Sequence, residues 1–429
     1  KEAYCLIQDD EGCTALHYAK TAEQTRLLLA NVTNPESYCL MKDDDGETAL
    51  HYSRIAEQTR LLLVNISDEN KDKYCLVQCR KGHTALHWAK TADQTRLLLD
   101  NVTDENKEKY CLIQNKYGFT ALHRAMTGEQ TQILLDNVKD KDKYCLIRSN
   151  CRNTALHRAK TAEQIQILLD NVKDKNKYCF EINHNGDTAL HLAKMEEQTQ
   201  ILLDNVKDPE AYCSEINDNG ETALHLAKTA RQTQVLLNAV YDKDTSNQKY
   251  CWEIKNFCLM KDDDGNTALH QAKTVEQTQV LLDNIKNKEK YCLIQNEYGW
   301  TALHLSKTAE QTQVLLDNVT DKESYCLMQD EAGYTALHYA KTSQQIIILL
   351  NYVTDKEAYC LHKSNSGITA LHYAETAEQT QILLDNVTNK GAYCLIKDSY
   401  GKTALDYSET AKQRRSEERR VGKECRSRW

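Results

Sequence analysis

The chain has 429 residues and a formal net charge of −9 at pH 7. Such an acidic chain disfavours nucleic acid and anionic membrane surfaces as partners, because both carry negative charge. The longest purely aliphatic run, Ile346 to Leu350, is far shorter than the ~20 apolar residues of a membrane span, so we expect no membrane segment.

The motif T-A-L-H occurs twelve times between Thr14 and Thr403, and in the last copy Asp406 replaces the His. Most copies follow one another at 34 residues, two steps are 36 and one is 45. A fixed period of this length indicates stacked supersecondary units rather than separate globular domains. We therefore predict one array, with repeats 1–7 in residues 1–245 and repeats 8–12 in residues 257–414.

The first unit shows how one copy is built. Asp9 to Gly12 is a turn signal, because Asp bonds its own backbone and Gly accepts a positive φ. Thr14 then opens a short helix over residues 15–20. Thr21 to Gln24 has the form of a capping box and predicts a second helix, in which an apolar stripe at helical spacing begins at Thr25. Each unit is thus predicted to be a turn and two helices.

The order of turn, G-x-T-A-L-H-x-A, short helix and helix carrying L-L resembles the ankyrin repeat, whose pattern is D-x-x-G-x-T-P/A-L-H-x-A. Eleven of the twelve copies keep both Gly and Thr, as in Gly46 with Thr48. The resemblance implies an all-α, ankyrin-like helix-turn-helix repeat solenoid of about twelve repeats. The copies have about three fewer residues between the Thr and the aliphatic triplet than the family pattern, which indicates a divergent subtype. The tetratricopeptide repeat shares the 34-residue period, but only two prolines occur and no Trp-Leu-Gly-Tyr pattern recurs.

Three irregularities interrupt the array. Six-residue polar linkers, Asp68 to Lys73 and Asp104 to Lys109, lengthen two steps, and we expect them to lie in loops. Residues 246–256 resemble the stub of a deleted repeat, and we predict a bulge or hinge there that limited proteolysis cuts first. Arg152 replaces the turn Gly of the fifth copy, where a positive φ costs ~1 kcal/mol.

The two ends of the chain differ from the repeats. Residues 415–429 resemble the translation of a sequencing adapter, and we expect them to be non-native. The alternative is a genuine basic tail, which would suggest an acidic partner. The first residue is Lys1 rather than Met, so we expect a fragment of a longer protein.

Cysteine and histidine recur as two ladders. Eleven His occupy the T-A-L-H position, and twelve Cys, one in each repeat from Cys5 to Cys394, follow an aromatic residue. Equivalent residues of stacked helices lie ~8–10 Å apart, which is too far for a disulfide, and no C-x-x-C pair offers zinc ligands. We expect no metal, no cofactor and no enzymatic activity. Seventeen cysteines without a pairing scheme favour a reducing compartment such as the cytoplasm, and delivery into a host cytosol is compatible with this.

The resemblance implies a structural part for the histidines. In the ankyrin family the His of this motif bonds the Thr that opens the helix and also the neighbouring turns. The matching pairs that we expect to act as structural latches include Thr14 with His17, Thr48 with His51, and Thr301 with His304.

Five N-x-S/T sequons arise from the N-V-T or N-I-S ending of a unit. We interpret their Asn as a helix C-terminal residue that tolerates a left-handed φ rather than as a glycosylation site. These residues are Asn31, Asn65, Asn101, Asn318 and Asn386.

Partner choice must depend on positions that differ between copies. Aromatic and Arg side chains at turn tips are typical of binding hot spots, and the resemblance implies that turn tips and first helices form a concave binding face. The predicted partner contacts are Arg80, Lys81, His83, Trp88, Lys116, Tyr117, Phe119, Arg124, Tyr298, Trp300 and Tyr334. For Trp88, Arg124 and Tyr339 the alternative is that they cover the groove between helices.

These patterns lead to one main functional hypothesis, a monomeric, non-catalytic scaffold that binds partner proteins. A second hypothesis is that the repeats belong to a larger enzyme or host-directed effector whose catalytic domain lies outside this chain. A third, a Cys/His metal store, would require stoichiometric zinc.

Overall fold

In a computed structural model of the chain, the described residues are 2–240 and 256–407. They are helical, and strand-like pairing within them is confined to two isolated bridges, Lys42 with Thr48 and Gln329 with Thr335. The predicted all-α repeat solenoid is confirmed. The chain divides into a first unit, Lys1–Ala193 with Glu197–Tyr212, and a second unit, Lys194–Glu196 with Cys213–Trp429.

The first helix of each repeat is a single turn of four residues, shorter than the predicted 15–20. The motif Thr is its N-cap, and the Ala after the fourth residue ends it with an extended backbone in most copies, as Ala89 does. In copies one and nine the same four residues form turns. The helices are α4 (Ala49–Tyr52), α7 (Ala85–Trp88), α10 (Ala121–Arg124), α13 (Ala155–Arg158), α16 (Ala189–Leu192), α19 (Ala223–Leu226), α22 (Ala268–Gln271), α27 (Ala336–Tyr339), the 3₁₀ helix η1 (Ala370–Tyr373) and residues 404–407.

The second helix begins where the capping box predicts. Thr21 accepts a bond from the Gln24 backbone N–H, and the Gln24 side chain accepts one from the Thr21 backbone N–H. The helices are α2 (Ala22–Leu29), α5 (Ala56–Val64), α8 (Ala92–Asp100), α11 (Gly128–Asp136), α14 (Ala162–Asp170), α17 (Glu196–Asp204), α20 (Ala230–Ala239), α23 (Val275–Asp283), α25 (Ala309–Asp317), α28 (Ser343–Asn351) and α30 (Ala377–Asp385).

A third helix, which the sequence analysis missed, precedes each turn and ends near the ladder Cys. Its N-cap is an Asp or Asn in most copies, as when the Asp140 carboxylate accepts a bond from the Lys143 N–H at 3.0 Å. These helices are α1 (Glu2–Cys5), α3 (Pro35–Leu40), α6 (Asp68–Cys75), α9 (Asp104–Leu112), α12 (Lys141–Cys145), α15 (Lys175–Cys179), α18 (Pro209–Ser214), residues 256–259, α24 (Lys288–Cys292), α26 (Lys322–Leu327), α29 (Lys356–Leu361) and α31 (Lys390–Cys394).

The prediction that the two polar linkers lie in loops is wrong. They form the first turns of α6 and α9, the longest of the third helices. Glu and Lys favour helix, and Lys71 pairs with Asp68 at 2.8 Å one turn away. The extra residues therefore lengthen a helix that the other repeats already have.

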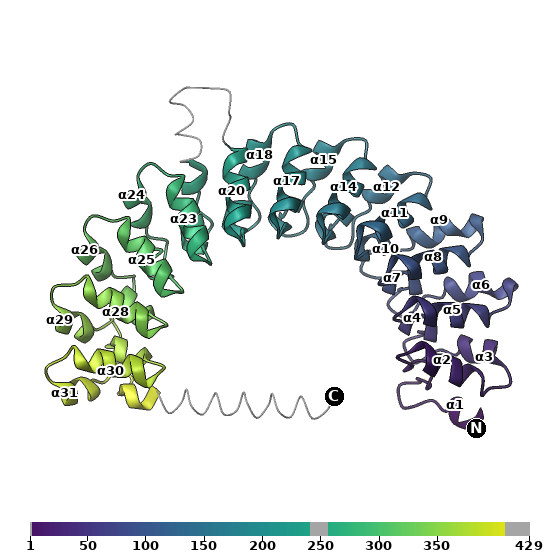
Figure 1. The fold of residues 1–429 in the computed structure, drawn as a ribbon, viewed down its shortest axis with the longest axis horizontal. Coiled ribbons are helices and arrows are strands. Elements are labelled where there is room, and N and C mark those ends of the chain that lie inside the picture. The colour runs from purple at the N-terminus through teal and green to yellow at the C-terminus, as the bar shows by residue number, and fades with distance from the viewer. Residues whose placement is uncertain (1, 241–255, 408–429) are drawn as a thin grey trace. The chain divides into compact units, whose positions relative to one another are not determined.

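First helices stack on the first helices of the next repeat, and second helices stack on second helices. In the first unit α5 packs on α2 and α8, and in the second unit α28 packs on α25 and α30. Figure 1 shows α25, α28 and α30 in one row of the second unit, with the third helices α26, α29 and α31 in a row beside it. Repetition of one interface is what allows four-residue helices to form, since none of them would be stable alone.

The core contains a ladder of buried tyrosines and cysteines. Tyr144 is fully buried, and its hydroxyl donates to the carbonyl oxygen of Cys111 in the preceding repeat at 2.9 Å. The same bond joins Tyr325 to Cys292 at 2.9 Å in the second unit. The aromatic residue and Cys before each turn therefore pack the third helices together.

The turns have the predicted backbone. Eleven turn glycines have φ between 72° and 78°, and Arg152 has φ 60°, the single non-glycine residue with positive φ in the described ranges. The sequon asparagines differ from the prediction, because they do not adopt a left-handed φ: Asn101 has φ −100°. Instead their side chains donate to the carbonyl four residues earlier, as Asn101 does to Leu97 at 2.8 Å. The amide nitrogen that glycosylation would modify is thus used as a helix cap.

Two predicted features lie outside the described residues, the insert at 246–256 apart from Asn256, and the tail at 415–429. The division into repeats 1–7 and 8–12 stays a prediction. Within residues 2–240 and 256–407, none of the helices combines the length and the apolar character that a bilayer span requires.

Candidate functional site

The variable turn residues are held on a regular backbone scaffold. In the repeat of α24, the Asn296 side chain accepts bonds from the backbone N–H groups of Tyr298 and Trp300 at 3.0 and 2.9 Å. The carbonyl of Tyr298 in turn accepts a bond from Glu331 N in the next turn at 3.0 Å. One such bond between neighbouring turns recurs along each unit, so the turn tips present their side chains at a regular spacing.

The recurring His of the motif holds the turn against the short helix. His304 Nδ1 accepts the Thr301 backbone N–H at 3.1 Å and lies 2.9 Å from Thr301 Oγ1. Its Nε2 lies 3.1 Å from the carbonyl oxygen of Met328 in the next repeat. Since Nδ1 accepts, the proton resides on Nε2, which donates to that carbonyl.

The same contacts recur at the first two copies. Thr14 N donates to His17 Nδ1 at 3.0 Å, and Thr48 N donates to His51 Nδ1 at 3.1 Å. Burial lowers the pKa of His51 to about 4 and also lowers that of His304. These imidazoles are therefore neutral at pH 7.

Five aromatic side chains of the second unit gather at the turns and first helices of three successive repeats. We call Tyr298, Trp300, Tyr334, Tyr339 and Tyr373 the aromatic cluster. Ring centroids lie 5.1 Å apart for Tyr298 and Trp300, 6.1 Å for Trp300 and Tyr339, and 5.9 Å for Tyr334 and Tyr373. Tyr298 is 47% exposed, whereas Trp300, Tyr334 and Tyr339 are half-buried.

A buried carboxylate anchors the centre of this cluster. Asp330 Oδ2 accepts bonds from Trp300 Nε1 at 2.9 Å and from the Tyr339 hydroxyl at 2.7 Å. Burial and this carboxylate raise the pKa of Tyr339, so its hydroxyl stays protonated and donates. Trp300 and Tyr339 are thus held rigidly, which limits the conformational entropy that a bound partner would have to remove.

A pocket of about 330 Å³ adjoins the cluster. Trp300, Leu305 and Tyr339 supply its apolar lining, and His270 and His304 lie at its buried side. Its other lining residues are Asn266, Gln271, Lys273, Ser306, Lys307 and Lys341. The second unit therefore offers an apolar hollow with aromatic walls and charged or polar edges.

The predicted contacts of the first unit are arranged differently. His83 is only 4% exposed, and its Nε2 lies 2.8 Å from Asn115 Nδ2. The half-buried Trp88 ring lies between His83, at a centroid distance of 4.8 Å, and the Arg124 guanidinium, 4.3 Å from the ring centre. Arg124 Nε also donates to the carbonyl of His87 at 3.0 Å. Trp88 and Arg124 have the contacts expected of residues that cover the groove between first helices.

The turn tips of the first unit keep an exposed surface. Arg80, Lys81, Lys116 and Tyr117 are exposed, and Phe119 is half-buried. The Trp88 Nε1 is buried with no hydrogen-bond partner among the described residues. In the second unit the equivalent Tyr339 finds a carboxylate nine residues earlier, whereas Trp88 has Cys79 at that position.

Sequence analysis missed the part played by Asp330. A signal was present, because four turns carry Asp nine residues before a Tyr. In each of these the Tyr hydroxyl donates to the Asp Oδ2 at 2.6–2.9 Å, in the pairs Tyr18 with Asp9, Tyr52 with Asp43, Tyr339 with Asp330, and Tyr407 with Asp398. The recurring pair therefore identifies which aromatic residues are held in place by their own repeat.

The cysteine ladder has the environment of packing residues. Cys39 and Cys111 have no exposed surface, and burial raises the pKa of each thiol to about 12. A thiol of this kind is a poor nucleophile and a poor metal ligand, because both functions need the thiolate. In the part of the chain that the structure describes, His, Cys, Asp and Glu side chains form no group of three or more suited to a metal.

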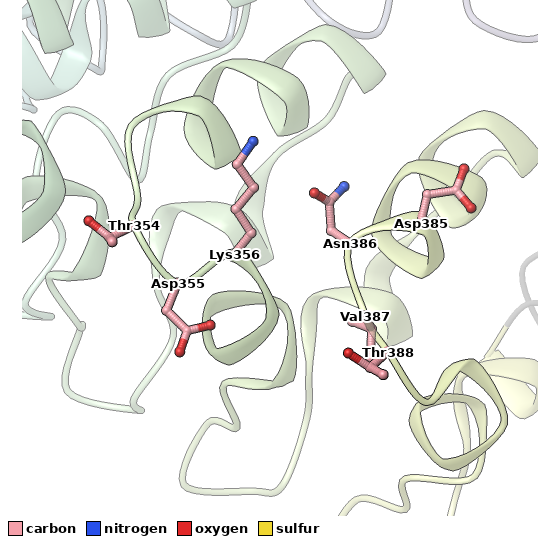
Figure 2. Close-up of a pocket in the computed structure, with 7 residues that line it drawn as sticks. All are labelled: Thr354, Asp355, Lys356, Asp385, Asn386, Val387 and Thr388. Carbon is pink, nitrogen blue, oxygen red and sulfur yellow. The ribbon is translucent and has the colours of Figure 1, made fainter.

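A second pocket, of about 670 Å³, lies at the opposite end of the second helices (Figure 2). Its polar groups are engaged within the repeats: Asp385 accepts from Lys390 at 2.6 Å, Asp355 caps α29, and the Asn386 amide donates to Ile382 at 2.8 Å. This hollow is open, and its polar groups already serve to cap helices or to pair within the repeats.

None of the protein-family models matches the chain, and no curated protein matches it. A solved structure that matches is the ankyrin repeat domain of Bcl-3, described as a unique member of the IkappaB protein family. The two share 22% identity, the match covers 53% of this chain and 99% of that chain, and the TM-score is 0.35.

Proposed function

We propose that the chain is a non-catalytic scaffold that binds segments of partner proteins at its turn tips and first helices. The aromatic cluster of the second unit carries this proposal. Rigid aromatic side chains that combine an exposed face with an internally satisfied polar group are typical of binding hot spots. Tyr298 and Trp300 present such faces, and the pocket beside Trp300 supplies a place for a partner side chain.

The remaining predicted contacts divide into two classes under this proposal. Arg80, Lys81, Lys116 and Tyr117 are exposed and would contact a partner directly. His83, Trp88 and Arg124 would support the surface from beneath, and the Thr–His pairs would act as structural latches. Half-buried Phe119 and Tyr334 would contribute the edges of their rings.

The chemistry of the two ladders supports the non-catalytic part of the proposal. Buried His51 has a pKa of about 4 and bonds within the fold through both ring nitrogens, so it is a weak base at pH 7. The ladder thiols are protonated at pH 7 and offer no thiolate for nucleophilic catalysis. Free cysteines throughout the described residues also support work in a reducing compartment. We propose protein partners and no cofactor.

The test is selection of binding peptides on the full chain, followed by hydrogen exchange with a selected peptide bound. We expect slower amide exchange in the turns at residues 296–300 and 330–334 and unchanged exchange in the third helices α24 and α26. Protection confined to the third helices would place the binding surface elsewhere. Failure to select any peptide would contradict the proposal.

A further inference from the structure

One position beside the aromatic cluster is basic throughout most of the array. The residue six places after the motif Thr is Lys or Arg in nine of the twelve copies, although the chain as a whole has a net charge of −9. In the second unit this position includes Lys273, Lys307 and Lys341, which all line the 330 Å³ pocket, and it becomes Glu375 in the repeat after Lys341. We call these three residues the lysine row.

The lysine row is exposed, and its charge is not neutralised by the chain. Within the described part of the second unit, no ion pair involves Lys273, Lys307 or Lys341. Lysines at the starts of third helices behave differently, since Lys288 pairs with Asp283 at 2.8 Å and Lys322 pairs with Asp317 at 3.2 Å. The positive charge of the row is therefore available to a ligand.

The row and the aromatic cluster border the same hollow. The lysines follow the first helices, whereas Tyr298 and Trp300 belong to a turn that precedes one. Leu305 and Tyr339 complete the apolar lining of the hollow together with Trp300. A ligand that fills this hollow would meet an apolar surface and, along one edge, a series of ammonium groups.

We propose that this groove binds an extended, acidic segment of a partner protein, with a large apolar side chain in the pocket and carboxylates on the lysine row. The proposal rests on the function proposed above and adds the chemistry of the partner. Stacked helices lie ~8–10 Å apart, and an extended chain advances ~3.3 Å per residue. Successive lysines therefore match carboxylates about three residues apart in the segment.

The surroundings favour such a segment over nucleic acid. Glu297 is exposed in the turn of Tyr298, and Asp264 accepts the Tyr298 hydroxyl at 2.8 Å. A polymer with phosphate charge along its whole length would approach these carboxylates as well as the lysines. A peptide can place acidic side chains on the row and neutral ones near the turn.

The experiment compares two charge-reversal variants of the full chain. One is Lys307→Glu with Lys341→Glu, in the row. The matched control is Lys286→Glu with Lys290→Glu, which changes the net charge equally at two exposed lysines, one before α24 and one within it. Peptides of about twelve residues, long enough to span about four repeats, are selected on the wild type by phage display. Their Kd is then measured by fluorescence anisotropy for each variant, with thermal unfolding to verify folding.

We expect selected peptides to carry Asp or Glu about three residues apart around a large apolar residue. Reversal in the row should raise Kd by about tenfold or more, because two attractive pairs become repulsive, and the control should change it by less than about twofold. Raising the salt concentration should weaken binding to the wild type. Single-stranded polyuridine of about twelve nucleotides should not bind.

Two results would overturn the inference. Selected peptides without an acidic excess, or with equal affinity for both variants, would show that the row is not used; the proposed function would still stand if Tyr298→Ala weakened the same peptides. Polyuridine that binds as tightly as the peptides, and loses affinity on reversal of the row, would assign the groove to nucleic acid. If no peptide is selected, or if Tyr298→Ala has no effect either, both proposals fail.

Discussion

The side chain of Gln130 donates from Nε2 to the carbonyl oxygen of Ala89, 2.9 Å away in the preceding repeat. The same amide also donates to Thr95 Oγ1 at 3.0 Å, while Gln130 Oε1 accepts the N–H of Met126 in its own repeat at 2.8 Å. One buried Gln thus closes a helix and joins two repeats. Equivalent bonds recur along both units, as from Gln345 to Ser306 at 3.0 Å.

Replacing this Gln should weaken the array. Gln130→Met keeps the length of the side chain but removes the bonds to the Ala89 carbonyl and the Met126 N–H, and each buried polar group left unpaired costs ~1–3 kcal/mol. We expect a loss of at least about 2 kcal/mol in the free energy of unfolding, measured with urea. Gln132→Met, on the same helix, is the control, because Gln132 bonds only the exposed Asp136. We call Gln130 and its equivalents in the other repeats the Gln ladder. Equal effects of the two substitutions would contradict the stabilising role of this ladder.

Arg152 offers a substitution that should stabilise the array. Its φ of 60° is strained for a residue with a Cβ, and Arg152→Gly should raise the free energy of unfolding by about 1 kcal/mol. Gly46→Ala should cost about the same amount, because a Cβ there meets its nearest atom at 3.7 Å. Gly118→Ala should cost more, since its Cβ would lie 2.7 Å from Asn150 N. A neutral or destabilising Arg152→Gly would show that the turn has adapted to Arg.

Sequence alone predicted the features that each repeat specifies locally. The turn Gly, the Thr–His motif and the capping box act over three to five residues, so their patterns are visible in one copy. The third helix was missed because residues such as Lys141–Cys145 carry no apolar stripe, and their helix depends on an Asp N-cap and on packing of Tyr144 and Cys145.

Exposure of the candidate contacts could not be predicted in the same way, because it depends on the next repeat. His83 and Trp300 occupy the same place before the motif Thr. His83 is buried against Asn115, whereas Trp300 reaches Asp330 and keeps an exposed face. The first residue of the next turn, Asn115 or Asp330, therefore decides which of them a partner can contact.

As the pH is lowered, the free energy of unfolding should decrease before the pH reaches the range in which carboxylates titrate. Burial lowers the pKa of His123 to about 4, from an unfolded value near 6.5. Between these values the unfolded chain binds more protons than the folded chain, so the free energy of unfolding decreases as pH falls through this window. The contribution is fully present above pH ~6.5.

His123→Asn isolates this effect. It should lower stability at pH 7 and flatten the dependence between pH 4 and 6.5 by up to about 1.4 kcal/mol per pH unit. Urea unfolding at several pH values measures both. An unchanged slope in His123→Asn would mean that the imidazole is charged in the folded chain.

The array should tolerate loss of its insert. Gln277 Nε2 donates to the Ala227 carbonyl at 2.9 Å and lies 3.2 Å from Thr233 Oγ1, so the Gln ladder joins the repeats on either side of it. Deleting Tyr241 to Cys251, which overlaps the insert at 246–256, restores the 34-residue step. We expect urea unfolding of the deleted chain to match the wild type within about 1 kcal/mol, since loop length changes stability only slightly. A larger decrease in the free energy of unfolding would show that the deleted residues stabilise the array.

The central claim is that the aromatic cluster binds partner segments. Trp300 is a poor probe, because its Nε1 bonds Asp330 and Tyr339 and its removal would disturb the cluster. Tyr298 is better, and Tyr400 is its matched control: it precedes the turn Gly of its own repeat, is 80% exposed and lies outside the cluster.

The decisive measurement is the Kd of a selected peptide for Tyr298→Ala and Tyr400→Ala beside the wild type. The account predicts that Tyr298→Ala weakens binding by about thirtyfold, the loss of a hot-spot residue worth ~2 kcal/mol. Tyr400→Ala should bind like the wild type, and both variants should keep its unfolding temperature. Equal affinity of all three proteins would contradict the claim.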